Sequence, residues 1–341
     1  MFSKLFDSFL VHYLERFNDH CFTVKIGDNE YTIGDGESEF TVIVNRDIPK
    51  KDLLISAELA LGEAYMRKDI EIEGDLFKAL CVVLGHVGKD SINRKVLSSL
   101  FNAGLKKKDQ KQQVSSHYDL GNEFYKLWLD ETMSYSCAYF KHDDDSLKDA
   151  QYQKVHHILD KLYLKEGMTL LDIGCGWGFL LIEAARKYGV KGYGCTLSEE
   201  QWKKGQERIK EYGLEGQVEI ELIDYRDVAA SGRTFDRIVS IGMLEHVGRP
   251  NFPLYMEDAS DMLKDGGLFL LHYISDPSEK ETSAWIRKYI FPGGCLPSLR
   301  EMVSLAYDYD MNVIDIESLR YHYYKTCLLY TSDAADDRIS V

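Results

Sequence analysis

The chain has 341 residues, of which 45% are hydrophobic and 28% charged, a composition typical of a soluble globular protein of about two domains. Its formal net charge of −15 argues against nucleic acid as a partner. We expect neither a membrane span nor a secretory signal, because no apolar run reaches about 18 residues and no cleavage site follows the N-terminal apolar residues. The seven scattered cysteines predict reduced thiols in a cytosol rather than a disulfide framework.

The N-terminal part predicts a small α+β domain over residues 1–95. Residues 1–20 have the spacing of an amphipathic helix, which either packs in a core or dimer contact or lies on a membrane surface. Three β-branched stretches separated by glycine turns then predict a small β-meander, with strands at 22–26, 31–33 and 40–44. Residues 52–100 return to helical spacing. We expect this domain to contact lipid, a membrane or a second copy of the chain.

A polar stretch, taken as a linker at 96–116, separates this domain from the rest. It contains the locally basic run Lys106-Lys-Lys-Asp-Gln-Lys111. Such a run is typical of a solvated face. The alternative is contact with anionic lipid headgroups at a membrane.

From residue 117 onward the pattern alternates between strands and helices. The expected strands are 169–173, 190–195, 218–223, 236–241, 267–273 and 312–316. The expected helices are 149–162, 179–188, 199–212, 251–263 and 298–308. This alternation predicts a Rossmann-like, mostly parallel sheet with helices on both faces.

The stretch Leu170-Leu-Asp-Ile-Gly-Cys-Gly-Trp-Gly-Phe179 predicts a buried strand that ends in a glycine turn and opens a helix. A dinucleotide fingerprint needs a third glycine where Phe179 stands, and an acidic residue at the end of the next strand, where the sequence has Thr196-Leu-Ser198. Asp172 suits a ligand with an ammonium group, and the helix start suits a carboxylate. These features favour S-adenosylmethionine (SAM) over NAD.

Two further loops should lie at the same edge of the sheet, because ligands bind outside the carboxyl ends of parallel strands. One is Thr196–Gln201, where Ser198 and Gln201 also have the spacing of a helix capping box. The other begins with Asp224 and Tyr225, which could hold an adenine by a hydrogen bond and a stacked ring.

Four more segments place reactive side chains near strand ends: Ser134–Phe140, Gly242–Gly248, Leu271–Ile274 and Tyr321–Lys325. Singly, each also has a structural interpretation. Glu245 and His246 could form a surface pair, Cys137 could be an inert core thiol, and His272 a satisfied core histidine.

Together these stretches resemble the cyclopropane-fatty-acyl-phospholipid synthases, within the SAM-dependent cyclopropane and mycolic acid synthase family. The matching segments are His117–Tyr125, Met133–Phe140, Leu171–Gly178, Thr196–Ser198 with Gln201, Asp224–Arg226, Ser240–Gly248 and Tyr289–Gly294. The resemblance covers roughly residues 1–326. It implies a class I SAM methyltransferase sheet over residues 117–326, behind the small N-terminal α+β domain.

The resemblance also implies a reaction. A cis double bond in an acyl chain of a membrane phospholipid takes the methyl group of SAM, and a bound bicarbonate removes a proton from the resulting carbocation as the cyclopropane closes. No metal is expected. The positions that match the bicarbonate site are Cys137, Glu245, His272, Ile274 (through its backbone) and Tyr323. With Asp172, the SAM contacts are Tyr135, Ser136, Gly174, Gly176, Thr196, Leu197, Gln201, Asp224 and Tyr225.

The chemistry requires that the alkene be aligned with the methyl group and that the cation be kept from water. A carboxylate at Glu245 would repel a bicarbonate. We therefore expect Glu245 to orient the anion, either with its charge offset by His272 or His246 or by accepting the bicarbonate hydroxyl.

The sequence departs from the family after about residue 326. Residues 327–341 have no periodic match to the expected strand or helix. They suggest an unrelated tail on a truncated chain, which would leave apolar surface exposed where the acyl tunnel lacks a wall. A smaller departure lies earlier in the chain, where Tyr273 stands at a position that usually has a small polar residue.

Two alternatives to the cyclopropane synthase remain. One is a methyltransferase that makes methyl-branched fatty acids or methylates a small molecule. The other is an inactive lipid-binding protein on an inherited fold. In either case we expect a cytoplasmic chain at the inner face of the membrane, and a homodimer is a further expectation. Salt-sensitive vesicle binding would favour the lysine run, and salt-independent binding the 1–17 helix.

Overall fold

The computed structural model describes residues 4–86, 121–279 and 282–335, which fall into two compact units. The first unit is 1–102 together with 282–290, and the second is 103–281 together with 291–341. The predicted linker at 96–116, its lysine run and residues 117–120 of the first family motif lie outside the described residues.

The first unit is a four-stranded sheet with helices. Its elements are α1 (Lys4–Leu14), η1 (Glu15–Phe17), β1 (Phe22–Ile26), β2 (Asn29–Ile33), β3 (Phe40–Val44), α2 (Lys50–Met66), β4 (Ile70–Gly74), α3 (Leu76–His86) and η4 (Ile286–Ile290). The strand order is β2-β1-β3-β4. The predicted meander is wrong, because β3 pairs in parallel with β1 rather than antiparallel with β2. The sequence analysis also missed β4, which pairs antiparallel with β3 and interrupts the predicted helical region.

The N-terminal helix α1 belongs to the core of this unit. Leu10 and Leu14 are buried, as is Phe17 of η1, and all three pack in one cluster with Phe22 and Val24 of β1. The apolar stripe of α1 therefore packs in a core, as the first interpretation of residues 1–20 expected. None of the helices in the described ranges has the length and hydrophobicity needed to cross a bilayer.

Residues 282–290 pack on α2 within this unit. Lys288 and the Tyr289 hydroxyl both hydrogen-bond Glu63, and Ser283 bonds Glu58. Gly62 allows the ring of Trp285 to approach, because a Cβ there would lie 2.5 Å from Trp285 Cζ3.

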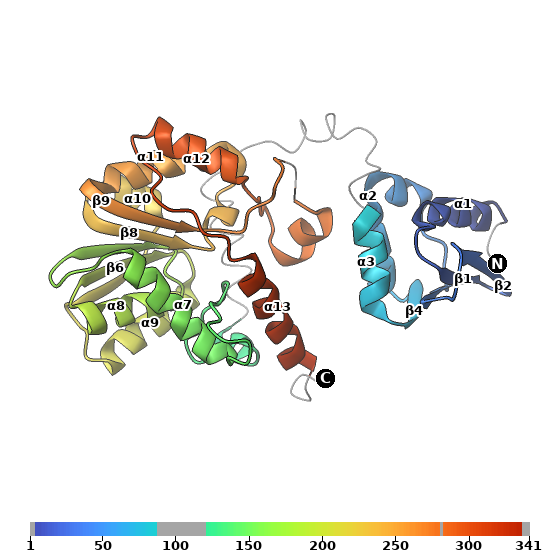
Figure 1. Ribbon diagram of the computed structural model, residues 1–341, viewed down its shortest axis with the longest axis horizontal. Coiled ribbons are helices and arrows are strands. Elements are labelled where there is room, and N and C mark those ends of the chain that lie inside the picture. The colour runs from blue at the N-terminus through green and yellow to red at the C-terminus, as the bar shows by residue number, and fades with distance from the viewer. Residues whose placement is uncertain (1–3, 87–120, 280–281, 336–341) are drawn as a thin grey trace. The chain divides into compact units, whose positions relative to one another are not determined.

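The second unit is built on a five-stranded parallel sheet (Figure 1). Its elements are α6 (Asn122–Tyr125), α7 (Leu147–Lys161), β5 (Thr169–Ile173), α8 (Phe179–Tyr188), β6 (Lys191–Thr196), α9 (Glu199–Glu211), β7 (Val218–Leu222), α10 (Tyr225–Ala230), β8 (Phe235–Ile241), η2 (Leu244–His246), η3 (Arg249–Asn251), α11 (Phe252–Met262), β9 (Leu263–His272), α12 (Leu299–Asp308) and α13 (Arg320–Ala335). In the strand order β7-β6-β5-β8-β9, the chain proceeds from β5 toward one edge of the sheet and from β8 toward the other. Such a switch point is where a doubly wound sheet binds its ligand.

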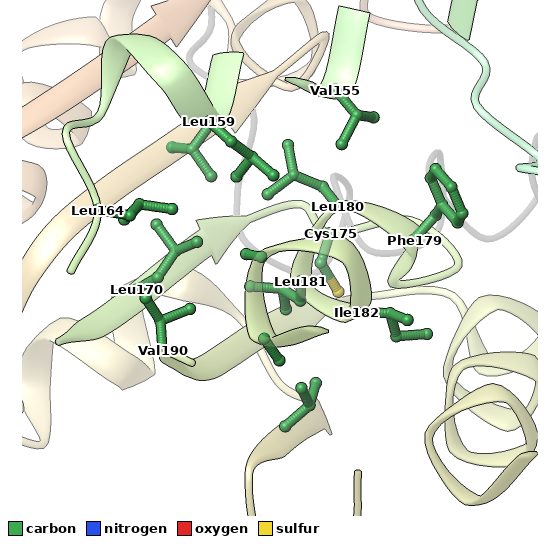
Figure 2. Packing of buried hydrophobic residues seen from close by; sticks show 14 of the residues in the cluster. Val155, Leu159, Leu164, Leu170, Cys175, Phe179, Leu180, Leu181, Ile182 and Val190 are labelled. Carbon is green, nitrogen blue, oxygen red and sulfur yellow. The ribbon is translucent and has the colours of Figure 1, made fainter. Parts of the chain in front are cut away.

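Both faces of this sheet are covered, as the sequence predicted. Successive strand residues point to opposite faces, so Leu170 of β5 packs with α7, α8 and α9 while Leu171 packs with α10, α11 and α12. Figure 2 shows the first of these layers, in which Leu159 of α7 and Leu181 of α8 surround Leu170. The expected α/β fold class is confirmed.

The sixth predicted strand, 312–316, does not form. These residues belong to an irregular segment between α12 and α13, and Ile314 is 76% exposed. The segment is instead held to α7 by its charges. Lys161 pairs with Asp315 and Glu317, and Glu317 also contacts His157.

Helix α13 runs without a break across residue 327 to Ala335. The expectation that the tail matches no helix is therefore wrong as far as Ala335. Tyr330 gives the physical reason. Its ring packs against Trp128 and Tyr135, and its hydroxyl donates to the carbonyl oxygens of Ser134 and Ser136 at 3.1 and 3.3 Å.

Candidate active site

The glycine turn after β5 lies at the switch point of the sheet. Gly174, Gly176 and Gly178 have φ values of 80°, 55° and 79°, a left-handed conformation that side chains disfavour. A Cβ on Gly174 would lie 2.8 Å from Met243, and one on Gly178 would lie 2.5 Å from Ile220. A Cβ on Gly176 meets nothing within 4 Å. Two of the glycines thus allow tight packing, whereas Gly176 faces open space.

One cavity at this edge of the sheet is lined by all ten residues expected to contact SAM. They are Tyr135, Ser136, Asp172, Gly174, Gly176, Thr196, Leu197, Gln201, Asp224 and Tyr225. The cavity is bounded by loops after four strands, β5, β6, β7 and β8, and by the segment before α7. Asp172 is only 3% exposed, and burial raises the pKa of its carboxyl to about 7 against the opposing charge of Lys154.

The loop after β6 combines helix capping with cavity lining. The Ser198 side chain accepts a hydrogen bond from Gln201 N at 3.3 Å and so caps α9. The Gln201 side chain does not complete the expected capping box, because its Oε1 accepts from the Thr196 hydroxyl at 2.8 Å. This bond keeps the two polar side chains together at the cavity wall.

The loop after β7 holds Asp224 by an internal ion pair. Arg226 donates to both carboxylate oxygens of Asp224, through Nε at 2.8 Å and Nη2 at 2.7 Å. Asp224 also caps α10 by accepting from Arg226 N. Tyr225 is buried beside it, with its ring at the edge of Tyr255 and its hydroxyl without a hydrogen-bond partner among the described residues.

The residues expected to act in ring closure come together in part. Glu245 Oε1 accepts from Ile274 N at 2.7 Å, and Glu245 O accepts from Cys295 N at 2.8 Å. Glu245 thereby joins the loop after β8 to the end of β9. Within the described residues, Glu245 Oε2 and His272 Nδ1 are both buried and have no hydrogen-bond partner. Two buried polar atoms without hydrogen bonds lower the stability of the fold unless a ligand forms hydrogen bonds with them.

The charges of this set differ from expectation. Burial, aided by the charge of Lys154, lowers the pKa of His272 to about 4, so the imidazole is neutral at pH 7. Of the options expected for Glu245, a charge offset by His272 is therefore contradicted, whereas an offset by His246 and acceptance of the bicarbonate hydroxyl stay predictions. Burial instead raises the pKa of Glu245 to about 7, so that its carboxyl is partly protonated near neutrality.

Cys137 is buried, and Tyr323 lies near enough to Cys137 and Glu245 for their charges to act on its hydroxyl. Burial raises the pKa of the Cys137 thiol to about 12, so the thiol remains protonated near neutral pH. Tyr323 is partly buried in α13. Burial, with the nearby Cys327 and Glu245, raises the pKa of its hydroxyl. The five residues that the resemblance assigned to ring closure lie outside the lining of the SAM-type cavity, with Cys137 and Glu245 adjacent in sequence to the lining residues Ser136 and His246.

The sequence analysis missed two buried polar residues of α7, Gln151 and Lys154. Lys154 lines the cavity and donates to Ser136 Oγ at 3.0 Å. Both lie at helical spacing with the buried Val155 and Ile158. A lysine and a glutamine on the apolar face of a predicted helix were the signal that could have identified them.

Comparison with known proteins shows the family of the chain. Residues 105–338 match the family model of mycolic acid cyclopropane synthetase, and residues 9–89 match a domain of unknown function (DUF7884). The chain belongs to the mycolic acid cyclopropane synthetase family. The family match includes most of the region that the sequence analysis took for an unrelated tail. Its fold is that of a SAM-dependent methyltransferase, as the sequence predicted.

Several relatives are similar over most of the chain. A probable fatty acid methyltransferase of Pseudomonas putida is 37% identical over 89% of this chain and 78% of its own length. The cyclopropane-fatty-acyl-phospholipid synthase of Escherichia coli K12 is 45% identical over 74% of this chain, which spans 65% of that protein. The mycolic acid cyclopropane synthase CmaA1, solved in complex with SAH and CTAB, is 35% identical with a TM-score of 0.62, over 66% of this chain and 83% of that one.

Proposed function

We propose that this protein transfers the methylene group of SAM to the cis double bond of unsaturated acyl chains in membrane phospholipid, forming cyclopropane fatty acids. The observation that carries this proposal is the pair of buried, unpartnered atoms Glu245 Oε2 and His272 Nδ1, on the two strand ends next to a cavity of the SAM type. A simple methyltransferase needs no second polar site beside the donor cavity. An enzyme that must also remove a proton does.

The residues of the cavity fit the parts of SAM. Asp172 suits the ammonium of the methionine half, and Asp224 and Tyr225 suit the adenine. Gly176 leaves room for the ligand against the backbone, since a Cβ there meets no protein atom within 4 Å. When bound, SAM supplies an electrophilic methyl group on sulfur.

The residues of the second site fit bicarbonate, which when bound would supply a base for the proton lost from the transferred methyl. A carboxyl with a pKa of about 7 can be protonated beside an anion, so Glu245 can donate through Oε2 while the Ile274 N–H holds Oε1. Neutral His272 can donate through Nδ1 in the appropriate tautomer. Cys137 and Tyr323 would close the site with protonated polar groups.

The lipid substrate follows from the chemistry and from the relatives. An alkene is a weak nucleophile, so the chain must align it with the methyl group and exclude water that would trap the cation. The Escherichia coli relative is named for a phospholipid substrate, and the Pseudomonas putida relative for a fatty acid. We propose a membrane phospholipid, reached by peripheral contact of the chain with the inner face of the membrane.

The test is incubation of the full chain with SAM carrying a labelled methyl group and vesicles of a phospholipid with cis-unsaturated acyl chains. The expected product gains the mass of one methylene, has lost the alkene signal and shows cyclopropane protons by NMR. Removing dissolved bicarbonate should reduce the rate, and restoring it should recover the rate.

Other products would favour the alternatives. A methyl branch on a chain that keeps an alkene or needs a reductant would identify a fatty acid methyltransferase. Binding of SAM by calorimetry without any lipid product would favour a lipid-binding protein and contradict the proposal.

A further inference from the structure

The buried lysine of α7 has no role in the proposed chemistry so far. The Lys154 side chain is 4% exposed and lines the donor cavity together with Asp172 and Ser136. An ammonium has three N–H donors, and within the described residues its hydrogen-bond partner is the neutral hydroxyl of Ser136 at 3.0 Å. It forms no ion pair with any carboxylate of the described part of the chain. The carboxylates of Asp130 and Asp172 act on this buried cation through their charge, but neither forms an ion pair with it.

The strip that carries Ser136, the hydrogen-bond partner of Lys154, is held in place by other residues. Gln151, one turn earlier on α7, donates to the carbonyl oxygens of Ser134 and Ser136 at 3.1 and 2.9 Å. Tyr330 donates to the same two carbonyls. The strip that carries Tyr135 and Ser136 into the cavity is thus fixed against the helix that carries Lys154. Because Gln151 and Tyr330 already anchor this strip, the strip does not need Lys154 for its stability. The Lys154 ammonium can therefore bind a ligand.

The cavity wall therefore includes a buried acid, Asp172, and a buried base, Lys154, near each other. The charges of Asp172 and Lys154 influence one another, and Lys154 lies on the cavity wall rather than behind it. The methionine half of SAM is a zwitterion with one ammonium and one carboxylate. Asp172 matches the ammonium. The carboxylate needs a cation with unused donors at a buried position, which Lys154 supplies.

We propose that Lys154 is a donor-binding residue whose ammonium pairs with the carboxylate of the methionine half of SAM. This proposal deepens the proposed function, on which it rests. It assigns to Lys154 a contact that the helix N-terminus after the glycine turn would otherwise make alone. If Lys154 contacted bicarbonate instead, substituting Lys154 would change the affinity for the donor by the same factor with or without the donor's carboxylate.

The test compares two probes, SAH and its decarboxylated analogue S-adenosyl-3-thiopropylamine, by calorimetry on the full chain. Loss of a charged hydrogen bond predicts that Lys154→Met weakens SAH about 10- to 100-fold. The analogue, which lacks the carboxylate, should bind the variant and the parent chain within about two-fold. Lys154→Gln, which can still donate to Ser136, should give the same pattern if Lys154→Met folds poorly. Lys154→Arg should retain most of the preference for SAH.

Lys148→Met is the matched control, because Lys148 is an exposed lysine of the same helix that pairs with Glu131 at the surface. It should leave both affinities unchanged. If the Lys154 variants weakened both probes equally, Lys154 would have a structural role. That result, or an unchanged SAH affinity, would overturn this inference but not the proposed function. The expected binding pattern without any cyclopropane product would overturn the proposed function alone. Failure of the parent chain to bind SAH would overturn both.

Discussion

The donor cavity and the proposed ring-closing site are assembled differently. The donor cavity is built from loops that directly follow β5, β6, β7 and β8, with a short strip before α7. The proposed ring-closing site draws on four segments between Cys137 and Tyr323, two of which are joined by the hydrogen bond from Ile274 N to Glu245. The first is set by local chain geometry, and the second by contacts between distant segments.

This difference has an energetic side. The carboxylate of Asp224 is matched by both arms of Arg226, and Thr196 is matched by Gln201. Among the described residues, Glu245 and His272 each keep one buried polar atom without a hydrogen-bond partner, and in the donor cavity the Tyr225 hydroxyl does the same. A site that leaves polar atoms unsatisfied is less stable but ready to bind a small polar ligand. Paired side chains at Asp224 and Thr196 give the donor cavity a defined shape, whereas the proposed ring-closing site retains capacity for hydrogen bonds at both Glu245 and His272.

Glu245→Gln is the variant that should separate the two sites most clearly. The amide keeps an acceptor for Ile274 N but cannot exchange a proton as the carboxyl can. We expect the rate of cyclopropane formation to fall about 100- to 1,000-fold, as for loss of a group that assists proton transfer. SAH affinity, measured by calorimetry, should stay within about two-fold. Ring formation at the full rate would show that Glu245 has no part in the chemistry.

The same variant should also change how stability depends on pH. Burial raises the pKa of Glu245 from 4.5 to about 7, so between these values the folded chain holds a proton that the unfolded chain has released. The free energy of unfolding therefore falls as the pH rises through this window. Glu245→Gln removes the effect and should gain up to about 3 kcal/mol relative to the parent chain at pH 8. Little difference is expected at pH 4.

Urea unfolding at both pH values measures this gain. Asp172, with a pKa also raised to about 7, remains in the variant, so a smaller pH dependence of the same sign should persist. A variant less stable than the parent chain at pH 8 would indicate that the carboxylate is stabilised by a partner.

Gly176→Ala tests the donor cavity. The new Cβ meets no protein atom within 4 Å, and the φ of 55° is one that alanine adopts only at a cost of about 1 kcal/mol. Because the open space belongs to the ligand, SAH affinity should fall about 10- to 30-fold while the chain stays folded. Gly167→Ala, at another glycine with positive φ and open space but outside the cavity lining, is the control. It should lose similar stability and no affinity.

The fold of the second unit could be predicted because each element carries its own signal. The strand of Thr169–Ile173 and the helix of Phe179–Tyr188 lie where the apolar pattern placed them. Prediction failed where pairing between segments decides the structure. The same alternating pattern gives a strand at Phe40–Val44 but an irregular segment at 312–316, whose Asp315 is held by Lys161 of α7.

The site shows the same limit. The glycine turn and the loop at Asp224 could be located from strand ends alone. The neutral state of His272 could not, since it results from burial at the end of β9, beside β8, and from the charge of Lys154. Neither could the part played by Tyr330, which reaches Ser134 and Ser136 from 196 and 194 residues away along the chain.

Arg226→Lys should have the smallest effect and shows which half of the donor each part of the cavity holds. Lysine keeps the charge but loses the two-armed pairing that fixes both oxygens of Asp224. If Asp224 meets the adenine, SAH affinity should fall about three-fold, as for a weakened orienting contact. The probe 5′-methylthioadenosine, which lacks the amino-acid half, should lose affinity by the same factor. The Lys154 variants should spare that probe, so a loss confined to SAH in Arg226→Lys would contradict the assignment of Asp224 to the adenine.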